Sequence, residues 1–167
     1  MATAGKNLSD YTEADVPSAA PYRFGIVTSE WNAEITDALL SGAEETLKKL
    51  GALPKNIVSL RVPGSFELPA AALWLAESGK IDAVIAVGSV IQGETRHFEF
   101  VCQAVAQGVK DVSIKTGIPA IFCVLTDDNI SQARDRSGGR HGNKGAEAAV
   151  AAVKMAALRA SLSGTGN

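Results

Sequence analysis

The 167-residue sequence contains no apolar run as long as the ~18 residues that a membrane-spanning helix requires. Residues 1–25 contain no apolar stretch that could act as a signal peptide. There is no block of basic residues either, and the formal net charge is −2, whereas nucleic-acid binding depends on neutralising phosphates. These absences predict a cytoplasmic protein that binds neither membranes nor nucleic acids.

Cysteine and histidine are scarce, with two residues of each. Cys102 and Cys123 lie in apolar surroundings, which is typical of buried free thiols rather than of catalytic or metal-binding ones. Two such cysteines and two histidines do not make a metal site, so we expect no metal ion. The motifs GxGxxG, GxxxxGK[ST] and GxSxG are also absent, which argues against a dinucleotide fold, a P-loop and a serine hydrolase.

The sequence does contain a regular alternation of β-branched runs and helical repeats. Strands are predicted at 23–29, 56–62, 81–91 and 118–126, and helices at 32–50, 70–79, 98–112, 130–137 and 146–162. This alternation predicts an α/β fold with three layers: a doubly wound, four-stranded parallel sheet with helices on both faces. The continuous apolar runs of the third and fourth strands predict that these two strands form the centre of the sheet.

The boundaries of the domain follow from the same pattern. Residues 1–21 show no sustained periodicity and are expected to form an N-terminal arm, while residues 22–167 form a single domain. A glycine-rich loop is predicted at 138–145. The closing helix has eight alanines between Ala146 and Ala160, so we expect it to pack through close backbone contact, which would also suit an interface with another subunit.

Three of the predicted strands end in turns that are rich in polar and aromatic residues: SEWN at 29–32, PGSFELP at 63–69 and GSVIQGETRHF at 88–98. Because the carboxyl ends of parallel strands lie at one edge of a sheet, these turns predict a single ligand site. Trp31 and Phe66 offer flat surfaces to a planar ring, and Glu67 can accept hydrogen bonds from a polyol. The alternatives are that Trp31 packs in the core and that Glu67 is a solvated carboxylate in the first turn of a helix.

The third turn holds the best acid or base candidate, His97, because histidine ordinarily changes charge near neutral pH. A solvated surface histidine is the alternative. Glu99 would not face His97 in a regular helix and is not expected to orient it. Thr95 and the N–H groups that open the helix can bind phosphate, and Arg136 can pair with the same group through its planar guanidinium. Arg134 and Arg140 compete for that role, and a solvated charged face is the alternative for all three arginines.

The segments VPGSFELP, GSVIQGETRHFEFV, GIPAIFCVLT and GNKGAEAA occur in this order. Together they resemble the lumazine synthase family, the 6,7-dimethyl-8-ribityllumazine synthases of riboflavin biosynthesis, over residues 22–162. The resemblance implies a flavodoxin-like fold. It also implies a transferase that condenses 5-amino-6-(D-ribitylamino)uracil with 3,4-dihydroxy-2-butanone 4-phosphate and releases phosphate and water, with no cofactor and no metal ion.

The resemblance implies a binding role for eight residues at the ribitylaminouracil. One stacks on the pyrimidine ring, three hold the ring and the ribityl chain, three contact the uracil edge from a strand end, and the last comes from a neighbouring subunit. In that order they are Trp31; Ser65, Phe66 and Glu67; Ser89, Val90 and Ile91; and Phe122.

The resemblance further implies that Glu94 and Thr95 form the turn that takes the butanone phosphate. Arg136 matches an arginine that binds this phosphate from across a subunit interface. His97 matches the histidine that transfers protons. The rival to this enzyme is a non-catalytic binder, either a ligand carrier or a structural shell, which would share the aromatic pocket but would not need His97.

The resemblance implies a homopentamer, in which the N-terminal arm adds an edge strand to the sheet of a neighbouring subunit. The family divides between free pentamers and hollow shells of twelve pentamers, that is, sixty subunits. The loop GGRHGNKG is short, which favours the shell, because longer loops there would obstruct contacts between pentamers. Association with riboflavin synthase is a further implication.

Overall fold

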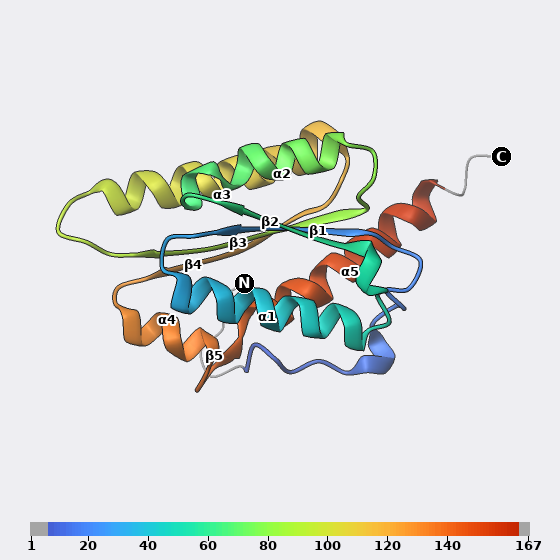
Figure 1. Cartoon of the computed structure of the whole chain (residues 1–167), viewed down its shortest axis with the longest axis horizontal. Helices are drawn as coiled ribbons and strands as arrows, with labels where there is room; N and C mark the ends of the chain where they lie inside the picture. The colour runs from blue at the N-terminus through green and yellow to red at the C-terminus, as the bar shows by residue number, and fades with distance from the viewer. Residues whose placement is uncertain (1–6, 164–167) are drawn as a thin grey trace.

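The computed structural model describes residues 7–163. Its centre is a parallel sheet of β1 (Phe24–Ser29), β2 (Ile57–Val62), β3 (Ala83–Ile91) and β4 (Ala120–Asp127), in the order β2-β1-β3-β4. The helices α2 (Leu68–Glu77) and α3 (His97–Thr116) cover one face, and α1 (Ala33–Lys49), α4 (Ile130–Arg136) and α5 (Lys144–Ser163) cover the other (Figure 1). The three-layer α/β fold expected from the sequence is confirmed. None of the helices between residues 7 and 163 is long and apolar enough to cross a membrane.

The position of β4 in the sheet corrects one prediction. The centre of the sheet is the pair β1 and β3, and β4 is an edge strand. The apolar run of β4 had suggested a central position, but helices on both faces bury an edge strand almost as well as a central one. An apolar run therefore shows that both faces of a strand are buried, but not that both of its edges are paired. Phe122 on β4 remains 36% exposed.

Successive residues of β3 enter two separate hydrophobic clusters, which explains its unbroken apolar run. Ile85 and Val87 pack with α1 and α5 on one face, while Val84 and Ala86 pack with α2 and α3 on the other. Side chains of a strand alternate between the faces of a sheet, so a strand covered on both sides needs apolar residues at every position.

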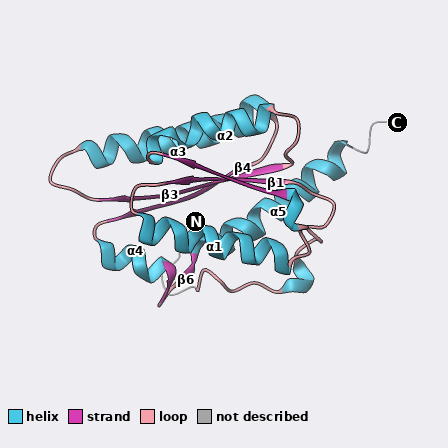
Figure 2. Cartoon of the chain, viewed as in Figure 1, coloured by secondary structure: helices cyan, strands magenta, loops and turns pink. Residues whose placement is uncertain are grey.

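The glycine-rich segment 138–145 is not an open loop, which corrects a second prediction. It contains a short antiparallel pair, β5 (Ser137–Gly139) and β6 (Gly142–Asn143), shown as arrows beside α4 in Figure 2, and Gly145 already lies in α5. Asn143 holds this hairpin in place. Its side-chain amide donates to the carbonyl oxygen of Ala38 in α1 at 2.9 Å, and its Oδ1 accepts the N–H of Gly145 at 2.8 Å.

The described part of the N-terminal arm, residues 7–21, lies against its own chain. The N–H of Leu8 donates to the carbonyl oxygen of His141 at 2.7 Å, and the N–H of Asn143 donates to Ser9 Oγ at 2.9 Å. Ala19 is fully buried in the cluster under α1 and α5, and Val16 packs against this cluster. Residues 1–6 of the arm lie outside the described residues, and pairing of the arm with a neighbouring sheet stays a prediction.

The helices α1 and α5 approach each other closely, as the alanines of α5 led us to expect. Ala148, Ala149 and Ala152 are buried in the hydrophobic cluster that α5 forms with α1 and the sheet. A Cβ atom on Gly145 would collide with the carbonyl oxygen of Leu39, so no side chain fits there. This small-residue face is therefore occupied by α1 of the same chain.

We expect Gly145→Ala to lower the free energy of unfolding by about 2 kcal/mol or more, because the added methyl group forces α1 and α5 apart. Urea unfolding followed by circular dichroism would measure this loss. Gly93→Ala is the matched control, because a Cβ atom at Gly93 meets no atom within 4 Å. Equal unfolding midpoints for the two variants would show that the contact between the helices can relax.

Candidate active site

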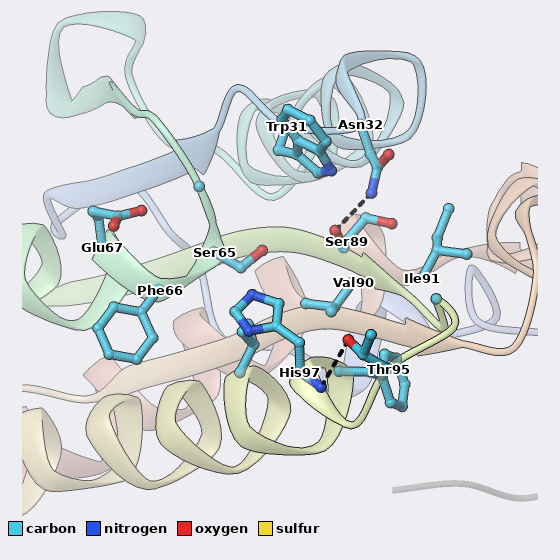
Figure 3. Close-up of a pocket in the computed structure, with 14 residues that line it drawn as sticks. Trp31, Asn32, Ser65, Phe66, Glu67, Ser89, Val90, Ile91, Thr95 and His97 are labelled. Atoms are coloured by element: carbon cyan, nitrogen blue, oxygen red, sulfur yellow. Dashed lines mark hydrogen bonds between the residues drawn. The ribbon is translucent and has the colours of Figure 1, made fainter.

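A pocket of about 350 Å³ opens at the carboxyl ends of β1, β2 and β3, on the face covered by α2 and α3 (Figure 3). Its walls come from the three turns singled out in the sequence and from the first turns of α3. The lining residues are Trp31, Asn32, Gly64, Ser65, Phe66, Glu67, Ser89, Val90, Ile91, Gly93, Thr95, His97, Phe98 and Val101. The prediction that the three turns meet in one place is thus confirmed.

Two aromatic side chains line the pocket and are largely exposed. Trp31 is 72% exposed and Phe66 is 62% exposed, so neither packs in the core. The backbone explains the position of Trp31: its N–H donates to the carbonyl oxygen of Pro63 at 3.3 Å, which extends the pairing of β1 with β2 by one step. The indole is thereby held beyond the end of the sheet, where it offers a flat apolar surface to a ring.

Gly88 brings the second turn against β3. A Cβ atom at this position would lie 2.7 Å from Ser65 Oγ and 2.9 Å from Leu68 Cδ1. The short helix η3 (Ser65–Glu67) therefore packs directly on the backbone of β3, and Pro69 follows in the first turn of α2. Glu67 is exposed at this end of the pocket.

Asn32 joins the ends of two strands. Its backbone is left-handed, with φ 60°, and although it precedes α1, its side chain does not cap that helix. Instead, Nδ2 donates to the carbonyl oxygen of Ser89 at 2.9 Å (Figure 3). This contact was not predicted from the sequence. The only available signal was that asparagine tolerates left-handed backbone better than most residues do.

We expect both Asn32→Gly and Asn32→Ala to lower the stability of the protein, because each removes the hydrogen bond to Ser89 that joins two strand ends at the pocket. Asn32→Ala should also be less stable than Asn32→Gly by about 1 kcal/mol, since only alanine pays for the left-handed backbone. Thermal unfolding of the two variants would measure the difference. Equal melting temperatures of the two variants would show that the backbone at residue 32 relaxes in Asn32→Ala, which would contradict the expected strain.

His97 is the first residue of α3, and its imidazole points into the pocket near the end of β3 (Figure 3). Its backbone N–H donates to Thr95 Oγ1 at 3.4 Å. The carboxylate of Glu99 pairs with Arg96 at 3.2 Å, in agreement with the prediction that it does not orient His97. The amino end of α3 opens at the pocket beside Gly93 and Thr95, and unpaired N–H groups at such an end attract anions.

Glu94, Phe122 and Arg136 do not line this pocket. Phe122 lies on the edge strand β4. Arg136 ends α4, which covers the face of the sheet opposite to α3 (Figure 1). Within one chain, therefore, the structure does not bring Arg136 together with His97.

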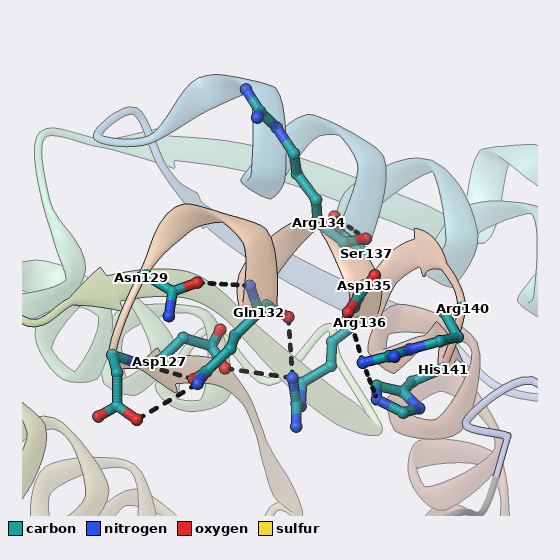
Figure 4. Close-up of polar contacts among 10 residues, drawn as sticks. Asp127, Asn129, Gln132, Arg134, Asp135, Arg136, Ser137, Arg140 and His141 are labelled. Atoms are coloured by element: carbon teal, nitrogen blue, oxygen red, sulfur yellow. Dashed lines mark hydrogen bonds and ion pairs between the residues drawn. The ribbon is translucent and has the colours of Figure 1, made fainter.

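The three candidate arginines differ in their partners, and Figure 4 shows those of Arg136 and Arg140. Arg134 makes two hydrogen bonds to Glu34, at 2.7 and 3.0 Å, and these bonds lower the pKa of the Glu34 carboxyl. Arg140 donates to Asp135 at 3.0 Å. Arg136 donates to the carbonyl oxygen of Gln132 at 2.9 Å, and its guanidinium lies 3.7 Å from Asp127. Of the three, only Arg136 has no carboxylate within hydrogen-bonding distance among the described residues.

Neither thiol is suited to nucleophilic chemistry. Burial raises the pKa of Cys123 to about 12, and burial also raises the pKa of the partly buried Cys102. Between residues 7 and 163 there is no group of three or more His, Cys, Asp or Glu side chains that could hold a metal ion.

Comparisons with known proteins show which family the sequence resembles. The model of the 6,7-dimethyl-8-ribityllumazine synthase family matches residues 21–160. A 6,7-dimethyl-8-ribityllumazine synthase of Flavobacterium psychrophilum is 58% identical over 95% of this chain and 84% of its own length. Proteins with the same name from Christiangramia forsetii and Parabacteroides distasonis are 57% and 53% identical, over 95% and 93% of this chain and 95% and 97% of their own lengths.

Proposed function

Because this chain belongs to the 6,7-dimethyl-8-ribityllumazine synthase family, we propose that the pocket at the ends of β1, β2 and β3 is its active site. The chain is a transferase of riboflavin biosynthesis that condenses 5-amino-6-(D-ribitylamino)uracil with 3,4-dihydroxy-2-butanone 4-phosphate. The observation that carries the assignment of the site is that exposed aromatic rings, an acceptor carboxylate and His97 line one pocket beside the start of a helix.

In this proposal the uracil ring lies against the aromatic surfaces of Trp31 and Phe66. Glu67 accepts hydrogen bonds from the ribityl hydroxyls, because an ionised carboxylate offers only acceptors. The backbone of Ser89, Val90 and Ile91 contacts the uracil edge. The carbonyl oxygen of Ser89 already accepts a bond from Asn32, so it has one lone pair left for the substrate.

The butanone phosphate lies at the amino end of α3. Thr95 and the N–H groups of the first turn hold the phosphate, whose charge the helix end stabilises. Glu94 contributes its backbone to this turn, since its carboxylate would repel the phosphate. A phosphate held in this way leaves more readily, because the charge that develops on it is already compensated.

Most of the rate enhancement comes from bringing the amine to the ketone in one pocket. Three steps then need a proton to be moved: imine formation, elimination of phosphate and ring closure. His97 points to the place where these steps occur and acts as the acid or base for them. No step in this scheme requires a metal ion or a cofactor.

Phe122 and Arg136 complete the pocket of a neighbouring subunit in this proposal. Their placement supports it, because α4 and the pocket lie on opposite faces of one sheet and Phe122 lies on an unpaired edge. A lone subunit would then lack part of the site, so the smallest active unit is a closed ring. We propose a pentamer of chains, each with an arm at 1–21 and one domain at 22–167.

We further propose a shell of twelve pentamers, because segment 137–143 is a compact hairpin held to α1 by Asn143. Five chains of 17.3 kDa amount to about 86 kDa and sixty to about 1,040 kDa. Sedimentation in phosphate buffer should therefore show a species near the larger mass. A single species near the smaller mass would leave only the pentamer. A cytoplasmic location and association with riboflavin synthase complete the proposal.

Release of phosphate from the two substrates together is the experiment that tests the activity. We expect turnover that requires both substrates. The absorbance of the lumazine product would measure its formation in the same experiment. A protein that binds the ribitylaminouracil but releases no phosphate would instead be a carrier.

A further inference from the structure

Asp127 is a buried carboxylate at the end of β4 that the proposed mechanism does not use. Asp127 is 5% exposed, and it pairs in register with Ile91, which lies in the pocket wall. Its carbonyl oxygen accepts the N–H of Gln92 at 2.9 Å. Asp127 is thus fixed through its backbone to the strand that lines the pocket.

The side chain of Asp127 is not fixed by hydrogen bonds. Its Oδ1 lies 3.7 Å from Nη1 of Arg136, which is too long for a hydrogen bond, and its buried Oδ2 has no hydrogen-bond partner among the described residues. Burial raises the pKa of this carboxyl, although the charge of Arg136 opposes the rise and that of Asp128 adds to it. The carboxylate and the guanidinium are therefore held together by charge alone.

The guanidinium of Arg136 is free to engage a second anion. Its Nη1 bonds to the carbonyl oxygen of Gln132, and its side chain is 37% exposed. Arg134, by contrast, is already bound in the two-point geometry that a phosphate would require.

We propose that Asp127 is a positioning residue that acts through Arg136: its negative charge keeps the guanidinium in place between turnovers and weakens the hold of Arg136 on the phosphate ion that the reaction has released, so that this ion can dissociate from the protein. This inference rests on the proposed role of Arg136 in binding phosphate. Asp127 and phosphate carry the same charge and compete for one guanidinium. Removing the charge of Asp127 should therefore tighten phosphate binding rather than weaken it.

The test is Asp127→Asn in the assembled protein, with inhibition by inorganic phosphate as the main measurement. We expect the inhibition constant of phosphate and the KM for the butanone phosphate each to fall about tenfold, and kcat to fall because the released phosphate ion dissociates more slowly. The KM for the ribitylaminouracil should not change. An inhibition constant that is unchanged or higher would overturn the inference.

Asp128→Asn is the matched control. It removes the same charge one residue away, from an exposed side chain that bonds to the amide of Gln132. We expect its effect on phosphate inhibition to stay within about twofold, because an exposed charge is screened by solvent. An effect as large as that of Asp127→Asn would mean that net charge, and not the buried pair, controls phosphate affinity, and would also overturn the inference.

The double variant Asp127→Asn, Arg136→Ala separates the two proposals. If Asp127 acts through Arg136, Asp127→Asn should have no effect in the Arg136→Ala background. If Arg136→Ala alone leaves phosphate affinity unchanged, the role of Arg136 fails, and this inference fails with it. If Arg136→Ala weakens phosphate binding but Asp127→Asn does nothing, only this inference fails.

Asparagine has the shape of aspartate and replaces a buried charge by a neutral group, so folding should survive the change. Thermal unfolding and sedimentation would check this. Asp127→Thr is the second variant, because threonine also removes the charge and suits the end of a strand. The same tightening of phosphate binding is expected from it, and a weaker hold on phosphate would count against the inference equally.

Discussion

Replacement of His97 by glutamine should lower kcat about 100-fold to 10,000-fold, which is the usual loss when an acid or base group is removed. Glutamine fills a similar volume and still makes hydrogen bonds, but it cannot exchange a proton near neutral pH. His97 points into the pocket and lies at its wall, outside the hydrophobic clusters, so the fold should not change. Stopped-flow or steady-state measurement of product formation, with binding of the ribitylaminouracil measured separately, would determine both effects.

Glu99→Gln serves as the control for this experiment. Glu99 lies in the same turn of α3 and pairs with Arg96 on the outside of the helix. Its replacement should leave kcat within about twofold, since exposed ion pairs contribute little. If His97→Gln turned over as fast as the unaltered protein, His97 would have no part in the reaction and the carrier hypothesis would gain.

The second large effect concerns two variants that are each nearly inactive at low concentrations of the butanone phosphate. Arg136→Ala should raise the KM for the butanone phosphate about 100-fold and leave that for the ribitylaminouracil unchanged, because only the former carries the phosphate. His97→Gln lowers kcat instead. When the two variants are dissociated, mixed in equal amounts and reassembled, about a quarter of the pockets should join an intact His97 to an intact Arg136 from the next chain. At low concentrations of the butanone phosphate, the activity should therefore rise to about a quarter of that of the unaltered protein.

The control is a mixture of the same two variants without dissociation, which should show only the sum of their separate activities. A second control reassembles each variant alone. If the mixed and reassembled protein showed no gain in activity, Arg136 would not serve a neighbouring pocket. It would then have either no role in the site or a role within its own chain. The opposite faces of the sheet occupied by α3 and α4 argue against the latter.

The fold and the pocket could be predicted from the sequence where local pattern decides the structure. The three polar turns follow their strands directly, and parallel pairing brings strand ends together without further information. The position of β4 could not be predicted, because its apolar run reports burial by helices and not pairing at its edges. The hairpin at 137–143 was missed because it depends on Asn143 bonding to Ala38, a residue 105 positions away.

The contacts of single side chains were harder still to predict. Asn32 occupies the position of a helix cap, yet its amide bonds to Ser89, and nothing local distinguishes the two uses. The pairing of Asp127 with Arg136 also depends on the way α4 folds back on β4. For Phe122 and Arg136, one chain is not enough to build the proposed site. The role of Phe122, and the proposal that Arg136 acts across a subunit interface, therefore came from family resemblance.

The distribution of thiols and the course of α5 have a practical consequence. Leu158 and Leu162 of α5 lie beside Gly117 and Pro119, at the edge of the sheet opposite to the pocket. Ser163 is exposed there, while Cys123 is buried and burial disfavours the thiolate of Cys102. A cysteine introduced at Ser163 would thus react with maleimides well ahead of the two native thiols. A dye or surface tether attached through it would leave the substrate entrance unobstructed on its own subunit.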